Sequence, residues 1–148
     1  MPHHLTRTAR VSALLFVAIL ITSCSAQESR SIFAAAPIDL EVGEGFTNPL
    51  GYYESTPRFS WKLSPSADYG FQSAYQVQVA SSAGNLEFSA DLWDSQKVVS
   101  ENTSWIRYQG KALSSRQQVF WRARVWDEGE RVSAWSDIQA FELGLLEN

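Results

Sequence analysis

The feature that most constrains this sequence is the alternation of apolar and polar side chains in short runs. Residues 75–79 read Tyr-Gln-Val-Gln-Val, and residues 58–63 read Arg-Phe-Ser-Trp-Lys-Leu. Because side chains two residues apart in a β-strand point to the same side, each run presents one apolar face and one polar face. No run after the N-terminal segment has the length and 3.6-residue period of an amphipathic helix. The alternation therefore predicts an all-β domain.

Seven runs rich in Val, Ile, Phe, Tyr and Trp are separated by clusters of turn residues. The expected strands are residues 38–42, 58–63, 74–81, 92–94, 104–108, 119–127 and 138–143. Residues 83–85 (Ala-Gly-Asn) and 127–130 (Asp-Glu-Gly-Glu) are expected to form hairpin-like turns. Strands with one buried face pack economically as two layers. We expect a fibronectin-III/immunoglobulin-like β-sandwich of about seven antiparallel strands over residues 37–146.

The N-terminal segment has the pattern of a secretory signal. Basic residues precede an apolar run over residues 11–21, which is too short for a stable membrane-spanning helix of about 20 residues. The following Ile-Thr-Ser-Cys at 21–24 resembles the bacterial lipobox, which implies a lipoprotein signal peptide over residues 1–23 and lipidation of Cys24. Ser25, rather than aspartate, implies an outer-membrane location. The alternative is an ordinary signal cut near Ser23 or Ala26, giving a secreted or periplasmic protein.

Residues 24–36 are small and polar without periodicity, so we expect them to form a flexible tether. Beyond the signal, 10 basic residues face 16 acidic ones, and the basic residues are scattered. Nucleic acid is bound through clustered Lys and Arg, so we expect no nucleic-acid partner. The domain is instead expected to reach the membrane through its lipid anchor.

The candidate chemistry of the domain is restricted by the residues it lacks. The sequence has two histidines, His3 and His4, both in the signal, and one cysteine, Cys24. Triads with a His base and His- or Cys-ligated zinc therefore do not fit, and we expect no metal site and no cofactor. The densest carboxylates, Asp127, Glu128 and Glu130, fall in a predicted turn exposed to water, which lacks the concavity a general acid requires. We expect no catalytic residue.

Several short motifs follow one another in a specific order. They read Asn-Pro-Leu-Gly at 48–51, Pro-Arg-Phe-Ser-Trp at 57–61, Ala-Tyr-Gln-Val-Gln-Val-Ala at 74–80, Leu-Trp-Asp-Ser at 92–95, Phe-Trp-Arg-Ala-Arg-Val-Trp-Asp at 120–127, Ser-Ala-Trp-Ser at 133–136 and Phe-Glu-Leu-Gly-Leu-Leu at 141–146. This set resembles the N-terminal fibronectin-III-like domain of bacterial α-L-rhamnosidases of glycoside hydrolase family 78. One departure is Gln96, where the family usually has glycine.

The resemblance implies further β domains and a helical catalytic barrel after this domain, so no catalytic residue is carried over to this chain. We expect a non-catalytic accessory or spacer module of an exported enzyme that degrades rhamnosides, partnered by downstream domains or by the product of a split gene. Leu143, Leu145 and Leu146 are expected to form an exposed apolar patch for such a partner. The alternative is a standalone surface lipoprotein that binds rhamnose-containing glycans.

A basic and aromatic ladder is the strongest local pattern. In the strand over residues 119–127, Arg122, Arg124 and Trp126 share the face opposite the core. The two arginines are expected to stack with Trp135, in a manner that resembles the ladders of cytokine-receptor fibronectin domains. We favour a structural role for this ladder. The alternative is that Trp126 and Trp135 form a platform for sugars or for a neighbouring domain, flanked by Arg122 and Arg124.

Overall fold

The computed structural model describes residues 35–65 and 71–146. The expected signal peptide over residues 1–23, the lipidation residue Cys24 and all but the last two residues of the tether lie outside the described residues.

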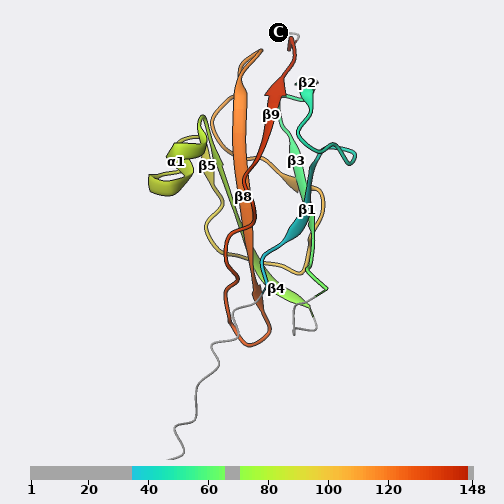
Figure 1. The fold of residues 1–148 in the computed structure, drawn as a ribbon, viewed down its shortest axis with the longest axis vertical. Coiled ribbons are helices and arrows are strands. Elements are labelled where there is room, and N and C mark those ends of the chain that lie inside the picture. The colour runs from blue at the N-terminus through green and yellow to red at the C-terminus, as the bar shows by residue number, and fades with distance from the viewer. Residues whose placement is uncertain (1–34, 66–70, 147–148) are drawn as a thin grey trace, which may run out of the picture. The chain divides into compact units, whose positions relative to one another are not determined.

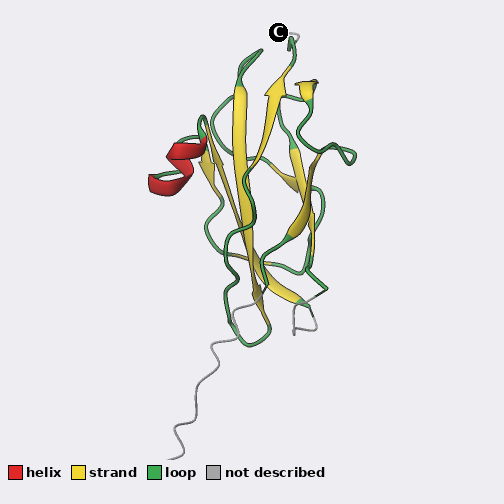
Figure 2. Cartoon of the chain, in the orientation of Figure 1, coloured by secondary structure: helices red, strands yellow, loops and turns green. Residues whose placement is uncertain are grey.

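The described residues form nine strands and one short helix, which Figures 1 and 2 show. The elements are β1 (Ile38–Val42), β2 (Leu50–Tyr52), β3 (Arg58–Lys62), β4 (Gln72–Ala80), α1 (Ala83–Phe88), β5 (Trp93–Asp94), β6 (Val98–Val99), β7 (Ile106–Arg107), β8 (Gln118–Asp127) and β9 (Gln139–Leu143). They form a three-stranded sheet in the order β1-β3-β7 and a larger sheet in the order β2-β9-β8-β4-β5, with β6 also paired to β4. Two sheets packed face to face confirm the all-β sandwich.

The two longest strands, β4 and β8, form the centre of the larger sheet. They pair antiparallel, with Tyr75 opposite Val125 and Val79 opposite Trp121. At the sheet edge, β2 pairs with β9 in parallel, although the sequence predicts antiparallel pairs. The last strand, β9, therefore lies between β8 and a strand from early in the chain, as Figure 1 shows near the C-terminus.

The core lies between the sheets and follows the predicted alternation. On β8, Val119, Trp121, Ala123 and Val125 are all buried, whereas the residues between them are partly exposed. From the smaller sheet, Phe59 meets Trp121 with ring centroids 4.4 Å apart. Aromatic pairs at such distances add about 0.5–1.5 kcal/mol beyond their buried area. The contact joins the two layers at the middle of the sandwich.

Residues 83–85 do not form the hairpin turn that their sequence predicts. They begin the six-residue helix α1, in which Ser82 is the N-cap and its hydroxyl accepts a hydrogen bond from the backbone N–H of Asn85 (3.2 Å). Leu86 is the helix's buried residue. The helix has a capping residue and one buried leucine. Its six residues are too few to show a helical period in the sequence.

The apolar patch expected at the C-terminal end is smaller than predicted. Leu143 is fully buried because it belongs to β9 and points into the core. Leu146 is partly buried and packs against the core, whereas Leu145 is 75% exposed. The prediction that all three leucines are exposed is therefore wrong for Leu143, since the strand places alternate residues inward.

Candidate functional site

The expected ladder is present on the outer face of β8. The guanidinium carbons of Arg122 and Arg124 lie 4.5 Å and 4.4 Å from the centroid of the Trp135 ring. Residues two apart in a strand are separated by about 6.6 Å, which leaves room for one ring between two guanidinium groups. Trp135 is therefore held between the arginines.

Two serines fix the segment that carries Trp135. The hydroxyl of Ser133 accepts from the backbone N–H of Val125 (3.0 Å), and the hydroxyl of Ser136 accepts from that of Ala123 (3.0 Å). The serine backbone N–H groups donate in return to the carbonyls of the same two residues (2.8 Å each). The Ser-Ala-Trp-Ser motif, which precedes β9 in the chain, is thus hydrogen-bonded to β8. This places the Trp135 ring against Arg122 and Arg124.

Glutamines on β4 hold the arginines from the other side. Arg124 Nε donates to Gln76 Oε1 (2.9 Å), and Arg122 donates to Gln78 Oε1 (3.0 and 3.1 Å). Both glutamine amides donate in turn to the carboxylate of Asp94 on β5 (2.7 and 2.9 Å). Burial raises the pKa of Asp94, but the donors Gln78, Gln76 and the backbone N–H of Gln96 outweigh it, so the net pKa is lowered.

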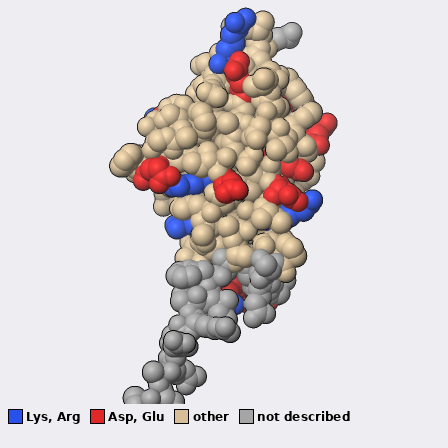
Figure 3. All heavy atoms as spheres, in the orientation of Figure 1, with Lys and Arg blue, Asp and Glu red and all other residues tan. Residues whose placement is uncertain are grey.

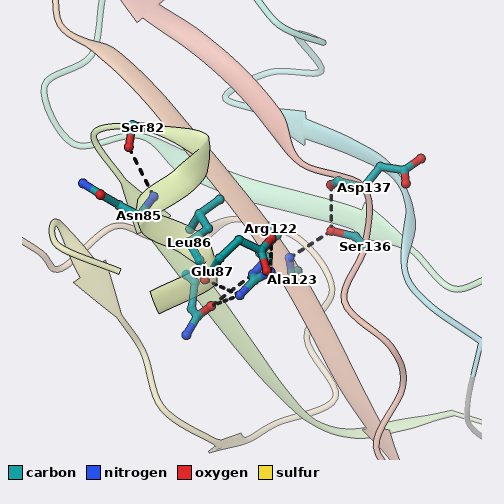
Figure 4. Close-up of polar contacts among 9 residues, drawn as sticks. Ser82, Asn85, Leu86, Glu87, Arg122, Ala123, Ser136 and Asp137 are labelled. Carbon is teal, nitrogen blue, oxygen red and sulfur yellow. Dashed lines mark hydrogen bonds and ion pairs between the residues drawn. The ribbon is translucent and has the colours of Figure 1, made fainter. Parts of the chain in front are cut away.

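The contacts of Arg122 extend to the helix (Figure 4). Its guanidinium donates to the carbonyl of Leu86 and lies 3.5 Å from the carboxylate of Glu87. In Figure 4 this side chain reaches across the sheet face toward α1. Arg122 therefore joins α1, β4 and the Trp135 segment.

Trp126 lies at the far end of the ladder. Arg124 and Lys97 each lie 5.1 Å from the centroid of its ring, and Lys97 is also paired with Glu130. The four residues expected at this site, Arg122, Arg124, Trp126 and Trp135, are thus brought together in one alternating row of cations and rings. Because cations already contact both rings, the arrangement favours the structural interpretation over a sugar platform.

The acidic turn differs from the prediction at one residue. Glu128 and Glu130 are exposed as expected, but Asp127 is buried. Its carboxylate accepts from the Arg131 guanidinium (2.6 Å) and backbone N–H (2.9 Å). Burial raises the pKa of Asp127, yet these hydrogen bonds outweigh burial and lower the net pKa. Such a group stays ionised near neutral pH, so it is unsuited to donate a proton as a general acid.

A second aromatic residue, Trp105, directly precedes β7 of the smaller sheet. Trp105 is 52% exposed, and its backbone φ of 60° is unusual for a bulky residue. The backbone N–H of Trp105 donates to the Ser60 hydroxyl (3.1 Å), and the Arg58 guanidinium lies 4.4 Å from the ring centroid. Alternation within the expected strand 104–108 is consistent with this exposure, because Ile106 and Tyr108 are buried.

Arg58 connects Trp105 to the core through two further residues. Arg58 Nη2 donates to Glu54 Oε1 (2.7 Å), and the hydroxyl of buried Tyr52 donates to Glu54 Oε2 (2.8 Å). Burial and Glu54 both raise the pKa of Tyr52. Position 43, next to Tyr52, requires glycine. A Cβ there would lie 2.6 Å from the Tyr52 hydroxyl, and the backbone φ of Gly43 is 63°.

Trp105 separates two shallow hollows. The first, of about 580 Å³, is lined by Tyr53, Glu54, Ser55, Thr56, Arg58, Trp105 and Arg107. The second, of about 550 Å³, is lined by Asp39, Glu41, Gly43, Glu44, Gly45, Ser60, Trp61, Lys62, Ser104 and Trp105. Both volumes fall in the range of about 300–1,000 Å³ that is usual for small-molecule sites.

The described part of the chain contains no group of His, Cys, Asp and Glu arranged to hold a metal ion. Within the same residues, no helix has the length and apolarity needed to cross a bilayer. On the face that Figure 3 shows, Lys and Arg lie beside Asp and Glu and do not gather into one basic region.

The fold and the ladder define an immunoglobulin-like β-sandwich domain. A family model described as the Rha78A-like, N-terminal immunoglobulin domain matches residues 37–147. The chain belongs to this family.

Its relatives are much longer proteins. An α-L-rhamnosidase of Alteromonas sp. (strain LOR) is 52% identical over 132 residues, which are 88% of this chain and 14% of the relative. One from Formosa agariphila is 47% identical over 133 residues, again 14% of its length. The chain thus matches only the N-terminal immunoglobulin-domain part of these enzymes.

Solved structures agree with the sequence relatives. The α-L-rhamnosidase from Dictyoglumus thermophilum superposes with a TM-score of 0.69 at 40% identity, over 74% of this chain and 12% of that one. The Streptomyces avermitilis α-L-rhamnosidase, solved with L-rhamnose, gives a TM-score of 0.64 at 42% identity, over 71% and 10% respectively.

Proposed function

We propose that this chain is the non-catalytic N-terminal accessory domain of an exported α-L-rhamnosidase-like glycoside hydrolase that takes part in rhamnoside breakdown. The observation that carries the proposal is the match of residues 37–147 to the N-terminal domain of enzymes of which it covers about 14%. The module stabilises the enzyme and spaces its catalytic region from the cell surface.

The chemistry of the domain supports a non-catalytic role. A glycosidase needs two carboxyl groups about 5–9.5 Å apart across the scissile bond, one with a raised pKa. The buried Asp127 and the half-buried Asp94 both have lowered pKa values and are held by donors. Neither can serve as the acid of such a pair.

The partner of the domain is proposed to be the catalytic region of the same enzyme, docked near the C-terminal end. Tyr53, Ser55, Leu145 and Leu146 line one hollow of about 390 Å³ there. Leu50, on the neighbouring strand β2, is 83% exposed. Apolar side chains exposed together in this way are normally covered by another protein surface.

The protein is also proposed to be exported and held at the cell envelope, in the outer membrane, by a lipid on Cys24. The proposal rests on the signal-like residues 1–23 and on the lipobox resemblance at 21–24. Diacylation supplies the two chains that stable anchoring needs.

A chimera tests the accessory role. The N-terminal domain of the Alteromonas rhamnosidase is deleted, and in a parallel protein it is replaced by residues 35–148 of this chain. We expect deletion to lower the thermal midpoint of the enzyme and the graft to restore most of it, because the graft covers apolar surface on the catalytic region again. Differential scanning fluorimetry and hydrolysis of p-nitrophenyl α-L-rhamnoside provide the readouts.

The variant Leu145→Glu in the chimera should lower the midpoint again, whereas Phe88→Ser, at the exposed end of α1, should leave it unchanged. A graft no more stable than the deletion would rule out the accessory role. Rhamnoside hydrolysis by the purified 148-residue chain above background would rule out the non-catalytic part of the proposal.

A further inference from the structure

We propose that the second hollow beside Trp105 binds a neutral pyranose unit of a glycan. The observation that carries this inference is an exposed indole that forms one wall of a hollow. The rest of the lining consists of carboxylates, a lysine, two serines, two glycines and the buried Trp61. The site is distinct from the ladder on β8 and lies on the other sheet of the sandwich.

One face of the Trp105 indole is covered by Arg58, and the other face is available to a ligand. Arg58 stacks on the ring and lines the first hollow, but it does not line the second. The guanidinium therefore lies on the side of the first hollow, and the ring borders the second hollow without such a cover. The apolar C–H face of a pyranose fits an electron-rich ring face of this kind.

The position of the indole is set before any ligand binds. The backbone of Trp105 is held by Ser60, and its ring is held by Arg58, which Glu54 ties to the buried Tyr52. A ring fixed by the core loses little freedom when a ligand stacks on it, and preorganisation of this kind raises affinity.

The polar lining of the second hollow suits hydroxyl groups. Asp39 is paired with Lys62 at 3.1 Å, and Glu41 also interacts electrostatically with this lysine. Within the described residues, neither Glu41 nor Glu44 accepts a side-chain hydrogen bond or lies within ion-pair distance of a cation. Ionised carboxylates are strong acceptors for hydroxyl donors. Glu41 lines the hollow beside Gly45, where a Cβ would be 3.6 Å from its Oε2.

The charge of the lining selects the class of sugar. Three carboxylates and one lysine line the hollow, which leaves a net negative charge that repels uronic acids and sulfated sugars. A neutral hexose or deoxyhexose unit satisfies the carboxylates without this repulsion. The choice of rhamnose as the first probe rests on the proposed function, whereas the geometry alone supports any neutral pyranose.

Isothermal titration calorimetry of the purified full chain tests the site. The probes are methyl α-L-rhamnopyranoside, a neutral rhamnose-containing oligosaccharide, a neutral oligosaccharide without rhamnose, and glucuronate. We expect saturable binding of at least one neutral probe and at least tenfold weaker binding of glucuronate. Trp105→Ala should weaken neutral-sugar binding at least tenfold, Trp105→Phe less, and Glu41→Gln about threefold or more.

Phe88→Ala is the matched control, because Phe88 is 93% exposed on α1, away from the hollow; it should bind like the unaltered protein. Circular dichroism and the thermal midpoint verify that each variant is folded. No saturable binding of any neutral probe, unaltered binding by folded Trp105→Ala, or equal affinity for glucuronate would each overturn the inference. None of these outcomes bears on the chimera, so the two proposals fail separately.

Discussion

Gln96 occupies a turn in a conformation that favours glycine. It follows β5 with a φ of 54°, and its backbone N–H donates to Asp94 Oδ1 at 2.8 Å. A non-glycine residue in the left-handed region is strained by about 1–2 kcal/mol. The turn therefore keeps the shape expected of a glycine position even though glutamine occupies it.

Replacing Gln96 with glycine should stabilise the domain. The substitution removes the strain at positive φ and leaves the backbone donor to Asp94 in place, although the greater freedom of glycine in the unfolded chain offsets part of the gain. We expect the free energy of unfolding to rise by about 0.5–1 kcal/mol. Urea denaturation followed by tryptophan fluorescence measures the change.

Glu101→Gly is the control for this substitution, because Glu101 is exposed in a loop and is not among the residues with positive φ. It should leave stability unchanged or lower it. If Gln96→Gly destabilised the domain as much as this control, the strain argument would be wrong.

Individual side chains show where sequence reasoning is limited. Alternation correctly predicts that Arg122 and Arg124 share the outer face, because both lie on the regular strand β8, whereas Trp135 lies outside the strands and its stacking was expected from the resemblance to other ladders. Asp127 was expected in water, but it is buried by Arg131, a residue four positions away that the turn brings back. Contacts of this kind depend on the path of a loop, and no periodic pattern encodes that path.

The strand β8 contacts more parts of the domain than its sheet neighbours alone. Its inner face forms the core, and its outer face carries the ladder that contacts β4, α1 and the Ser133–Ser136 segment. The ladder's central ring, Trp135, contacts two arginines. Removing this one ring should therefore loosen the segment and the arginines together.

Trp135→Ala should destabilise the domain by about 1–3 kcal/mol. Two cation–π contacts of about 0.5–1 kcal/mol each are lost, together with the apolar contact of the indole with the arginine side chains. For a domain of this size the thermal midpoint should fall by roughly 4–8 °C per kcal/mol. Scanning calorimetry measures it.

Phe88→Ala serves as the comparison, since it also removes an exposed aromatic ring, but one outside the ladder. It should change the midpoint by under about 4 °C, in line with surface substitutions of about 0.5 kcal/mol or less. Equal effects of the two substitutions would show that the ladder contributes nothing to stability.

The long strands could be predicted, and so could the short strands β5 and β7, which lie within the expected runs 92–94 and 104–108, whereas β2 and β6 could not. β8 alternates between buried and less buried residues over its 10 residues, whereas most of β4 is buried, including Gln72 and Gln76. β2 and β6 have three and two residues, which is too short for a period. The pairing of β2 with β9 in parallel depends on where a long connection leads. It is a tertiary property that local propensity does not determine.

For the whole molecule, the ladder could be predicted from residue order, whereas the hollows beside Trp105 could not. The second hollow combines β1, the loop after it, β3 and the segment before β7, and β3 lies between β1 and β7 in the sheet. The alternation around Ile106 would have indicated that Trp105 points outward. Nothing in the spacing of Glu41 and Trp105 indicates that they share a cavity.

The anchor proposed for the whole protein is tested at Cys24. In a Gram-negative host, Cys24→Ala should move the protein from the membrane fraction to the soluble fraction and abolish metabolic labelling with an alkyne fatty acid, because each buried CH₂ of the lipid contributes about 0.8 kcal/mol. Ser25→Ala, which keeps the thiol, should stay labelled and membrane-bound. A Cys24→Ala protein that remained in the membrane fraction would contradict the anchor.

The last strand, β9, is held on both sides, by β8 in one direction and by β2 in the other. Beyond it, the backbone N–H of Gly144 still donates to the carbonyl of Tyr52 (2.8 Å). A pulling force applied to the chain after Leu146 would load these hydrogen bonds along the strand direction, in shear, so that several must break at once. Under tension this end of the sandwich would therefore resist unfolding more strongly than an arrangement in which the hydrogen bonds break one after another.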